Sequence, residues 1–150
     1  TLIRVKVPAV VFSALPLPAL AETYYPQTAR REMEAGKVLL LAAGTGNPYF
    51  TTDTAAALRA SELGADLILK ATQVDGVFSA DPKKEPSARR FDRISYLQVL
   101  EKGLKVMDAT AISLCMENAL PIVVFNLSVP GNIKRVVMGE RIGSIVSDRA

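Results

Sequence analysis

The residues of this chain that could do chemistry lie in two polar turns, each following an apolar run. The first turn, residues 44–53, carries two glycines, three threonines, an asparagine and an aspartate, and the second, residues 71–82, contains Thr72, Asp75 and Asp81. The backbone N–H groups of a glycine-rich turn and of the helix after it can hold an anion. On pattern alone the first turn is also consistent with an ordinary βα turn. The second favours a hairpin whose aspartates cap turns.

Residue types that are missing narrow the chemistry further. The chain has 150 residues, a net charge of +3, no histidine and one cysteine, Cys115. Ser-His-Asp triads, Cys-His pairs, His-ligated metals and disulfide frameworks are therefore excluded, and Cys115 fits a packed helix in a reducing compartment. The first turn does not match the Rossmann or P-loop pattern. The remaining acids, bases, hydroxyls and amides suit phosphoryl transfer, which needs positioning and charge neutralisation.

The elements that must position the two turns follow from hydrophobic patterning and capping residues. Apolar runs predict strands at 10–14, 38–43, 66–70 and 121–126, with a closing edge strand at 143–146. Helices are predicted at 26–35, 54–63, 95–101, 109–118 and 130–137. This order predicts one α/β domain over residues 1–150, an open and mainly parallel sheet with flanking helices. Strands 38–43 and 66–70 are expected to be the parallel strands of a β–α–β unit.

The N-terminal apolar run, residues 7–20, has two interpretations. It follows Arg4 and Lys6 and ends near Ala21, as in a secretory leader. Pro16 and Pro18 break the run, which is also too short to cross a bilayer as a helix. We therefore prefer an interior strand of a longer protein, with a secreted protein cleaved at Ala21 as the alternative. The basic pairs at 83–84 and 89–90 lie in a Pro-rich loop, which favours a solvated loop over a nucleic-acid surface.

Several motifs together closely resemble the bacterial-type uridylate (UMP) kinases of the amino acid kinase superfamily. They lie in order along the chain, at residues 43–54, 69–82, 103–109, 124–126 and 130–139. The resemblance covers nearly everything from about Val11 onward and implies a partial amino acid kinase fold. It also implies transfer of the γ-phosphoryl of ATP, with Mg²⁺, to UMP, giving UDP and ADP in pyrimidine nucleotide biosynthesis. The implied enzyme is an allosteric homohexamer with GTP and UTP as effectors, in the cytoplasm or, in a plant, the plastid stroma.

The resemblance further implies roles for particular residues. ATP would contact Thr72, Phe78 and Asp81. Asp53 and Asp81 would lie near the transferred phosphoryl group, where they could organise Mg²⁺ or a phosphate-bound lysine. Neither is expected to act as a base, because a phosphate nucleophile is already anionic. No metal site built from protein ligands alone is expected. UMP would be held by Thr45, Gly46, Asn47, Pro48, Tyr49, Phe50, Thr51 and Thr52.

Two departures from the family pattern qualify these expectations. Gln73 stands where many members carry a lysine, which implies less positive charge near the ATP phosphates. Residues 1–37 contain no match to the family's N-terminal lysine and glycine-rich turn, or to the glycines, arginine and aspartate that complete the UMP site. We therefore expect the 150-residue chain to be catalytically incompetent on its own.

Two other functions stay open. One is a superfamily kinase acting on glutamate, aspartate or carbamate, against which residues 44–53 argue. The other is a non-catalytic, nucleotide-binding regulatory module. Neither a membrane nor a nucleic acid is expected as a partner.

Overall fold

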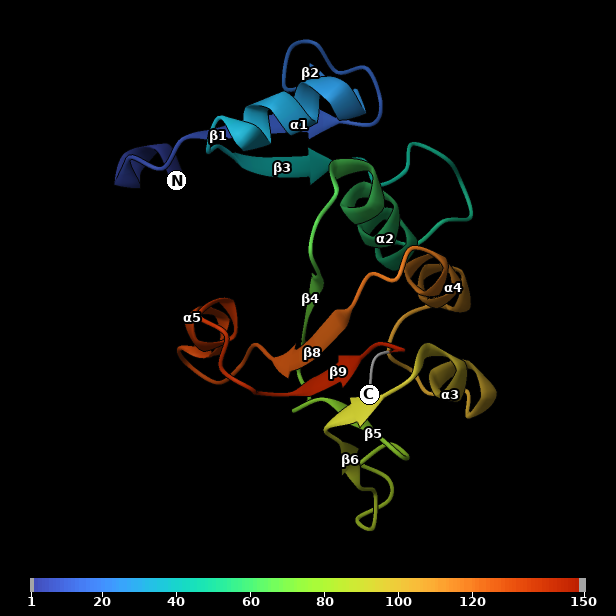
Figure 1. Cartoon of the computed structure of the whole chain (residues 1–150). Helices are drawn as coiled ribbons and strands as arrows, with labels where there is room; N and C mark the ends of the chain where they lie inside the picture. Colours follow the sequence, from blue (N-terminus) through green and yellow to red (C-terminus); the bar gives the residue numbers. More distant parts are fainter. Residues whose placement is uncertain (1, 149–150) are drawn as a thin grey trace. The chain divides into compact units, whose positions relative to one another are not determined.

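The computed structural model describes residues 2–148, with the elements labelled in Figure 1. Two compact units make up the chain, the first ending at Gly64 and the second beginning at Ala65. The prediction of a single domain over residues 1–150 stays a prediction.

The first unit is a small parallel sheet with a helix packed on it. Its elements are η1 (Leu2–Val5), β1 (Ala9–Ser13), β2 (Glu22–Thr23), α1 (Pro26–Glu34), β3 (Val38–Ala42) and α2 (Thr52–Leu63). The strands lie in the order β2-β1-β3, with every pair parallel. Phe12 and Ala29 are fully buried, and Leu39 packs against them, so α1 covers one face of the sheet. The strand predicted at 10–14 is confirmed by β1.

One predicted β–α–β unit is wrong and another takes its place. β3 does not share a sheet with β4 (Ile68–Thr72), because β3 pairs with β1, and β4 pairs with β8 (Ile122–Asn126) in another sheet. The parallel pair around a helix is therefore β1–α1–β3. All four strands are short apolar runs, and such a run carries no signal that identifies its neighbour.

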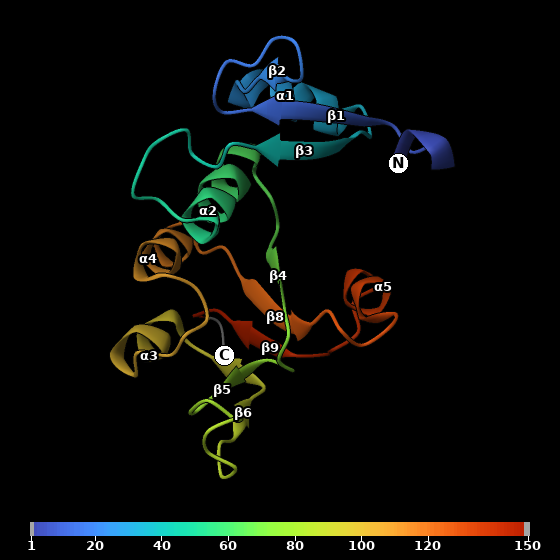
Figure 2. The ribbon, with the colours of Figure 1, turned by 180° about the vertical axis from the view of Figure 1, so that it is seen from behind.

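The second unit holds a four-stranded mixed sheet and a small hairpin. Besides β4 and β8 it contains β5 (Val77–Phe78), β6 (Arg90–Phe91), β7 (Arg93–Ile94), α3 (Tyr96–Glu101), α4 (Ala109–Glu117), α5 (Asn132–Val137) and β9 (Ser144–Val146). The sheet order is β4-β8-β9-β7, with β8 and β9 antiparallel and the other neighbours parallel. Helices α3 and α4 flank one side of this sheet and α5 flanks the other (Figures 1 and 2). The predicted α/β class with flanking helices is confirmed.

The second unit also corrects three local predictions. β9 is not an edge strand, since it lies between β8 and β7. β4 begins at Ile68, two residues later than predicted, so Thr72 ends the strand rather than following it. The Pro-rich loop predicted around the two basic pairs is shorter than expected, because Arg90 lies in β6, which pairs antiparallel with β5. The hairpin that contains β5 therefore extends beyond the segment 71–82, in which the turn residues favoured it.

Local sequence signals predicted the helix ends more closely than the pairing of the strands. The Thr51 hydroxyl accepts hydrogen bonds from the N–H groups of Asp53 (3.1 Å) and Thr54 (3.2 Å), so α2 begins two residues earlier than predicted. Gly64 ends α2 in the left-handed conformation, with φ +69°. Ser95 caps α3 and Asp108 caps α4. Each cap satisfies N–H groups that a helix cannot satisfy internally.

Candidate functional site

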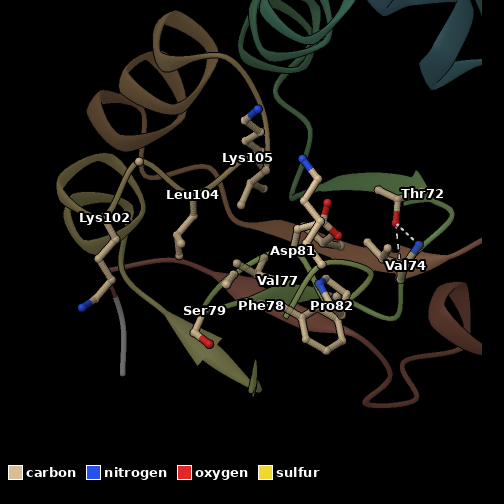
Figure 3. Close-up of a pocket in the computed structure, with 16 residues that line it drawn as sticks. Thr72, Val74, Val77, Phe78, Ser79, Asp81, Pro82, Lys102, Leu104 and Lys105 are labelled. Atoms are coloured by element: carbon tan, nitrogen blue, oxygen red, sulfur yellow. Dashed lines mark hydrogen bonds between the residues drawn. The ribbon is translucent and has the colours of Figure 1, made fainter. Parts of the chain in front are cut away.

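A pocket of about 400 Å³ lies in the second unit, at the carboxyl end of β4 (Figure 3). The end of β4, the turn after it, β5, the first part of the loop between β5 and β6, and the segment after α3 form its walls. All three predicted ATP contacts, Thr72, Phe78 and Asp81, line it. The other lining residues are Val74, Gly76, Val77, Ser79, Ala80, Pro82, Lys84, Lys102, Gly103, Leu104, Lys105, Val106 and Val124. The structure therefore brings the predicted donor-site residues together.

The Thr72 hydroxyl shapes the first wall of this pocket. It lies 2.8 Å from the carbonyl oxygen of Val74 and accepts a hydrogen bond from the Val74 N–H at 3.2 Å (Figure 3). The same oxygen lies 3.3 Å from the carbonyl oxygen of Phe125 in β8. These contacts hold the chain in a tight turn directly after the strand.

Val77 lines the pocket and is held by a buried serine, Ser144, which was not predicted from the sequence. Ser144 is fully buried, and its hydroxyl accepts a 2.8 Å hydrogen bond from the Val77 N–H and donates to the Phe91 carbonyl. Gly76, with φ +148°, allows this approach, since a Cβ there would overlap Ser144. Gly143 similarly makes room for the backbone of Val124. A glycine–serine pair beside a short strand was the available signal, and it pointed equally well to an ordinary turn.

The charges in the pocket are mostly positive. Lys84, Lys102 and Lys105 line it, and Asp81 is the one acid among the lining residues that the structure describes. The Asp81 carboxylate accepts a 2.9 Å hydrogen bond from the Lys83 N–H, so it caps the following turn as well as lining the pocket. Apolar side chains such as Leu104 complete the walls. Cationic and apolar groups in one cavity suit an anion attached to an apolar or aromatic body.

The predicted UMP turn lies in the first unit, between β3 and α2. Gly44 and Gly46 are left-handed, with φ +60° and +77°, and the Gly46 N–H donates to the Ala43 carbonyl at 3.0 Å. The Asn47 N–H donates to the Thr45 hydroxyl at 3.1 Å, and the Asn47 side-chain amide donates to the Thr45 carbonyl at 3.3 Å. These local hydrogen bonds give the first half of the turn a defined shape.

The second half of this turn is open to solvent. Tyr49 is fully exposed and has φ +70°, a backbone conformation that residues other than glycine rarely adopt. Phe50 is 53% exposed. Thr51 caps α2, and Asp53 lies in its first turn. The helix N-terminus therefore follows directly after the glycine-rich segment, as an anion site requires.

The expected proximity of Asp53 and Asp81 stays a prediction, because the two residues belong to different units. Within residues 2–148, no cluster of three or more Cys, Asp or Glu side chains could hold a metal ion. Mg²⁺ commonly binds through one or two carboxylates together with substrate phosphates, and Asp81 is the acidic residue among the described residues that line the pocket. No described helix combines the length and apolarity needed to cross a membrane.

Comparison with known proteins identifies the class of this fold and site. The sequence profile described as "Amino acid kinase family" matches residues 6–126, and the chain belongs to this family. The match covers the first unit from Lys6 onward, the residues that line the pocket, and β8.

Within that family the similarity is to uridylate kinases. The chain is 52% identical over 143 residues to the uridylate kinases of Legionella pneumophila strains Lens and Paris, covering 95% of the chain and 58% of each relative. The crystal structure of a UMP kinase from Bacillus anthracis matches with a TM-score of 0.93 and 36% identity, covering 97% of the chain and 60% of that structure. The crystal structure of a UMP kinase from Ureaplasma parvum matches with a TM-score of 0.92 and 38% identity, covering 98% of the chain and 63% of that structure. The chain thus spans about three fifths of the length of these relatives.

Proposed function

We propose that the chain supplies the nucleotide sites of a UMP kinase, which transfers the γ-phosphoryl group of ATP to UMP and gives UDP and ADP. The observation that carries the proposal is the pocket that Thr72, Phe78 and Asp81 line together with three lysines. The 52% identity to uridylate kinases supports the choice of UMP as acceptor. Phosphoryl transfer suits this set of residues because it relies on positioning and charge neutralisation rather than on a nucleophilic side chain.

The pocket in the second unit is the proposed ATP site. Lys84, Lys102 and Lys105 would neutralise phosphate charge, and the Phe78 side chain adds apolar surface. Asp81 would help to hold Mg²⁺, which supplies charge neutralisation to the phosphates when it is bound. Thr72 would act through the turn that its hydroxyl holds.

The turn in the first unit, residues 45–52, is the proposed UMP site. Its N-terminal half offers the Thr45 and Asn47 side chains, which we assign to the uracil. Thr52, the first residue of α2, would lie near the UMP phosphate, where helix N–H groups favour negative charge. Asp53, one residue further on, is the proposed acidic neighbour of the transferred group.

Nucleotide titrations followed by amide NMR on the 150-residue chain test both sites. ATP with Mg²⁺ is expected to shift residues 72–84 and 102–106, and UMP is expected to shift residues 44–53. Lys105→Gln should weaken ATP binding, whereas Lys6→Gln, a matched change of an exposed lysine in the other unit, should not. Shifts by glutamate, aspartate or carbamate but not by UMP would instead favour another kinase of the family.

A phosphotransfer assay separates binding from turnover. We expect no UMP-dependent ADP release from the chain alone, because residues 1–37 lack the lysine and glycine-rich turn that the resemblance implies. ADP release by the purified chain would overturn that expectation. Fusing the N-terminal region of a Legionella uridylate kinase to the chain is expected to give turnover. Nucleotide binding without turnover even in the fusion would favour a regulatory module.

The assembly and location of the whole protein are further proposals. The resemblance to UMP kinases supports a homohexamer that responds to GTP and UTP in the cytoplasm, or in the plastid stroma of a plant. Light scattering coupled to size-exclusion chromatography tests the hexamer, and activity measured with added GTP or UTP tests the effector response.

A further inference from the structure

One arginine in the first unit links helix α2 to the start of the proposed UMP turn. The Arg59 guanidinium donates a 3.1 Å hydrogen bond to the carbonyl oxygen of Gly44, fifteen residues earlier in the chain. A second nitrogen of the same group lies 2.7 Å from the Glu62 carboxylate. The guanidinium carbon lies 4.0 Å from the centre of the Tyr24 ring. One side chain therefore contacts the turn, the helix and the segment after β2.

The partners of Arg59 are themselves fixed in place. The Tyr24 hydroxyl donates a 2.9 Å hydrogen bond to the same Glu62 oxygen that Arg59 contacts. Tyr24 also packs edge-on against the buried Phe12, with ring centroids 6.2 Å apart. Burial, followed by the adjacent Glu62 carboxylate, raises the pKa of Tyr24 to about 12, so the hydroxyl keeps its proton at neutral pH. Arg59 is thus held by Glu62 and by Tyr24, and Tyr24 itself packs against the core of the unit.

The guanidinium group is well suited to this position. The Arg59 side chain is only 11% exposed, so its contacts are weakly screened by solvent. A planar guanidinium can stack on an aromatic ring while its nitrogens donate hydrogen bonds in fixed directions. A lysine carries the same charge at a single point and cannot reproduce all three contacts.

The carbonyl that Arg59 contacts occupies a sensitive place in the turn. Gly44 is left-handed, and it immediately precedes Thr45, the first residue of the proposed UMP site. A Cβ on Gly46 would come within 3.2 Å of the Ala14 carbonyl, so the turn also lies close to β1. Fixing the Gly44 carbonyl therefore fixes the direction in which the chain enters the turn.

We propose that Arg59 is a positioning residue, which holds the 44–51 turn in the conformation that receives the acceptor nucleotide. This inference rests on the proposed function for its ligand, but the effect of Arg59 on the turn itself does not. Arg59 acts through the Gly44 carbonyl and is not assigned a contact with UMP.

The test compares Arg59→Met, Arg59→Lys and the matched control Arg30→Met in the full 150-residue chain. Arg30 also donates to α2, through a 2.7 Å hydrogen bond to the carbonyl of Glu62, a residue that lies outside the turn. Amide hydrogen exchange at Gly46 and Asn47 reports the turn without any ligand. Dissociation constants for UMP and for ATP with Mg²⁺ report the two proposed sites separately.

Arg59→Met is expected to speed exchange in the turn and to raise the UMP dissociation constant about tenfold, a change that corresponds to 1.4 kcal/mol, while the ATP constant stays unchanged. Arg59→Lys should give a smaller effect of the same kind, and Arg30→Met should give neither. If Arg59 only stabilised the fold, Arg59→Met would lower the melting temperature and would weaken the binding of UMP and of ATP to the same extent. Unchanged turn exchange in Arg59→Met, or equal loss of both nucleotides, would overturn the inference. If the unaltered chain binds no UMP but Arg59→Met still loosens the turn, the proposed function fails and the positioning role stands.

Discussion

The side-chain amide of Asn126 donates a 2.9 Å hydrogen bond to the carboxylate of Asp75, joining residues that are 51 positions apart in the sequence. Asn126 is the last residue of β8, and Asp75 lies in the turn that follows β4. The same asparagine accepts a 2.8 Å hydrogen bond from the Ser128 N–H and, through its carbonyl, a 2.9 Å bond from the Asn132 side chain. Asn126 therefore connects the turn beside the pocket to the approach to α5.

Asn126→Ala removes this connection and is expected to destabilise the second unit by about 1 kcal/mol, the usual contribution of a protein hydrogen bond. Asn126→Asp should be worse, because it places a second carboxylate against Asp75 at neutral pH. Urea unfolding at pH 7 measures both variants. Asn118→Ala is the control. Among the contacts of the described residues, the Asn118 side chain bonds only to Leu114 in its own helix. Equal stability of Asn126→Asp and Asn126→Ala would contradict the electrostatic part of this prediction.

Asp81→Asn separates the charge of Asp81 from its capping role. The amide oxygen can still accept the hydrogen bond from the Lys83 N–H, so the turn should keep its stability. ATP binding should become less dependent on Mg²⁺, because a charged oxygen ligand is lost. Isothermal titration with and without Mg²⁺ measures this effect. Asp81→Ala should lose both the cap and the Mg²⁺ dependence, and an unchanged Mg²⁺ dependence in Asp81→Asn would remove Asp81 from the metal site.

Ser144→Ala is expected to destabilise the second unit by about 1–3 kcal/mol, because the Val77 N–H and the Phe91 carbonyl lose a buried partner. The loss should also loosen β5 and weaken ATP binding, since Val77 and Phe78 line the pocket. Thermal unfolding and ATP titration check the two effects. Ser87→Ala, which removes an exposed hydroxyl from the loop, should change neither. A fully stable Ser144→Ala variant would show that water or a shifted backbone replaces the serine.

Alkaline pH should destabilise the second unit through Tyr96 and Cys115. Burial raises the pKa of Tyr96 from 10.0 to about 12, and its hydroxyl donates a 2.5 Å hydrogen bond to the Leu120 carbonyl. Burial also raises the pKa of the Cys115 thiol from 9.0 to about 11. Because the unfolded chain loses these protons first, stability should fall from about pH 9 for Cys115 and from about pH 10 for Tyr96.

Substitutions divide this pH dependence between the two groups. Tyr96→Phe should lower stability at neutral pH but remove part of the fall between about pH 10 and pH 12, and Cys115→Ala should remove part of the fall that begins near pH 9. Denaturation midpoints measured from pH 7 to pH 11.5 provide the test. Tyr25→Phe is the control, because the Tyr25 side chain is 61% exposed. Identical pH profiles for Tyr96→Phe and the unaltered chain would exclude Tyr96 as a contributor.

Helix caps could be predicted from the sequence because their signals are local. A threonine or serine before a helix, as at Thr51 and Ser95, can satisfy the exposed N–H groups whatever surrounds it. The segment 72–81 was predicted to hold ATP by its resemblance to a family, and Thr72, Phe78 and Asp81 do share a pocket. Lys102 was not singled out, because an exposed lysine after a short helix is typical of any surface.

Strand pairing and long-range contacts were not predictable in the same way. The run 38–43 predicted a strand correctly, but its pairing with β1 rather than β4 depends on which apolar faces can be buried together. The same is true of β9, which looks like a closing edge strand and lies inside the sheet. In the sequence Arg59 is an ordinary helix residue. Only the folded chain brings it into contact with Tyr24, Gly44 and Glu62.

The sequence by itself therefore determined the helix ends, the apolar runs, the two polar turns and the family resemblance, because each depends on neighbouring residues or on a recognisable string. The tertiary structure alone decided which strands pair, which lysines line the pocket and which arginine supports the turn. Those features depend on contacts between residues far apart in the chain. Such contacts stabilise the protein only once the intervening loops have closed, and closing a loop costs chain entropy.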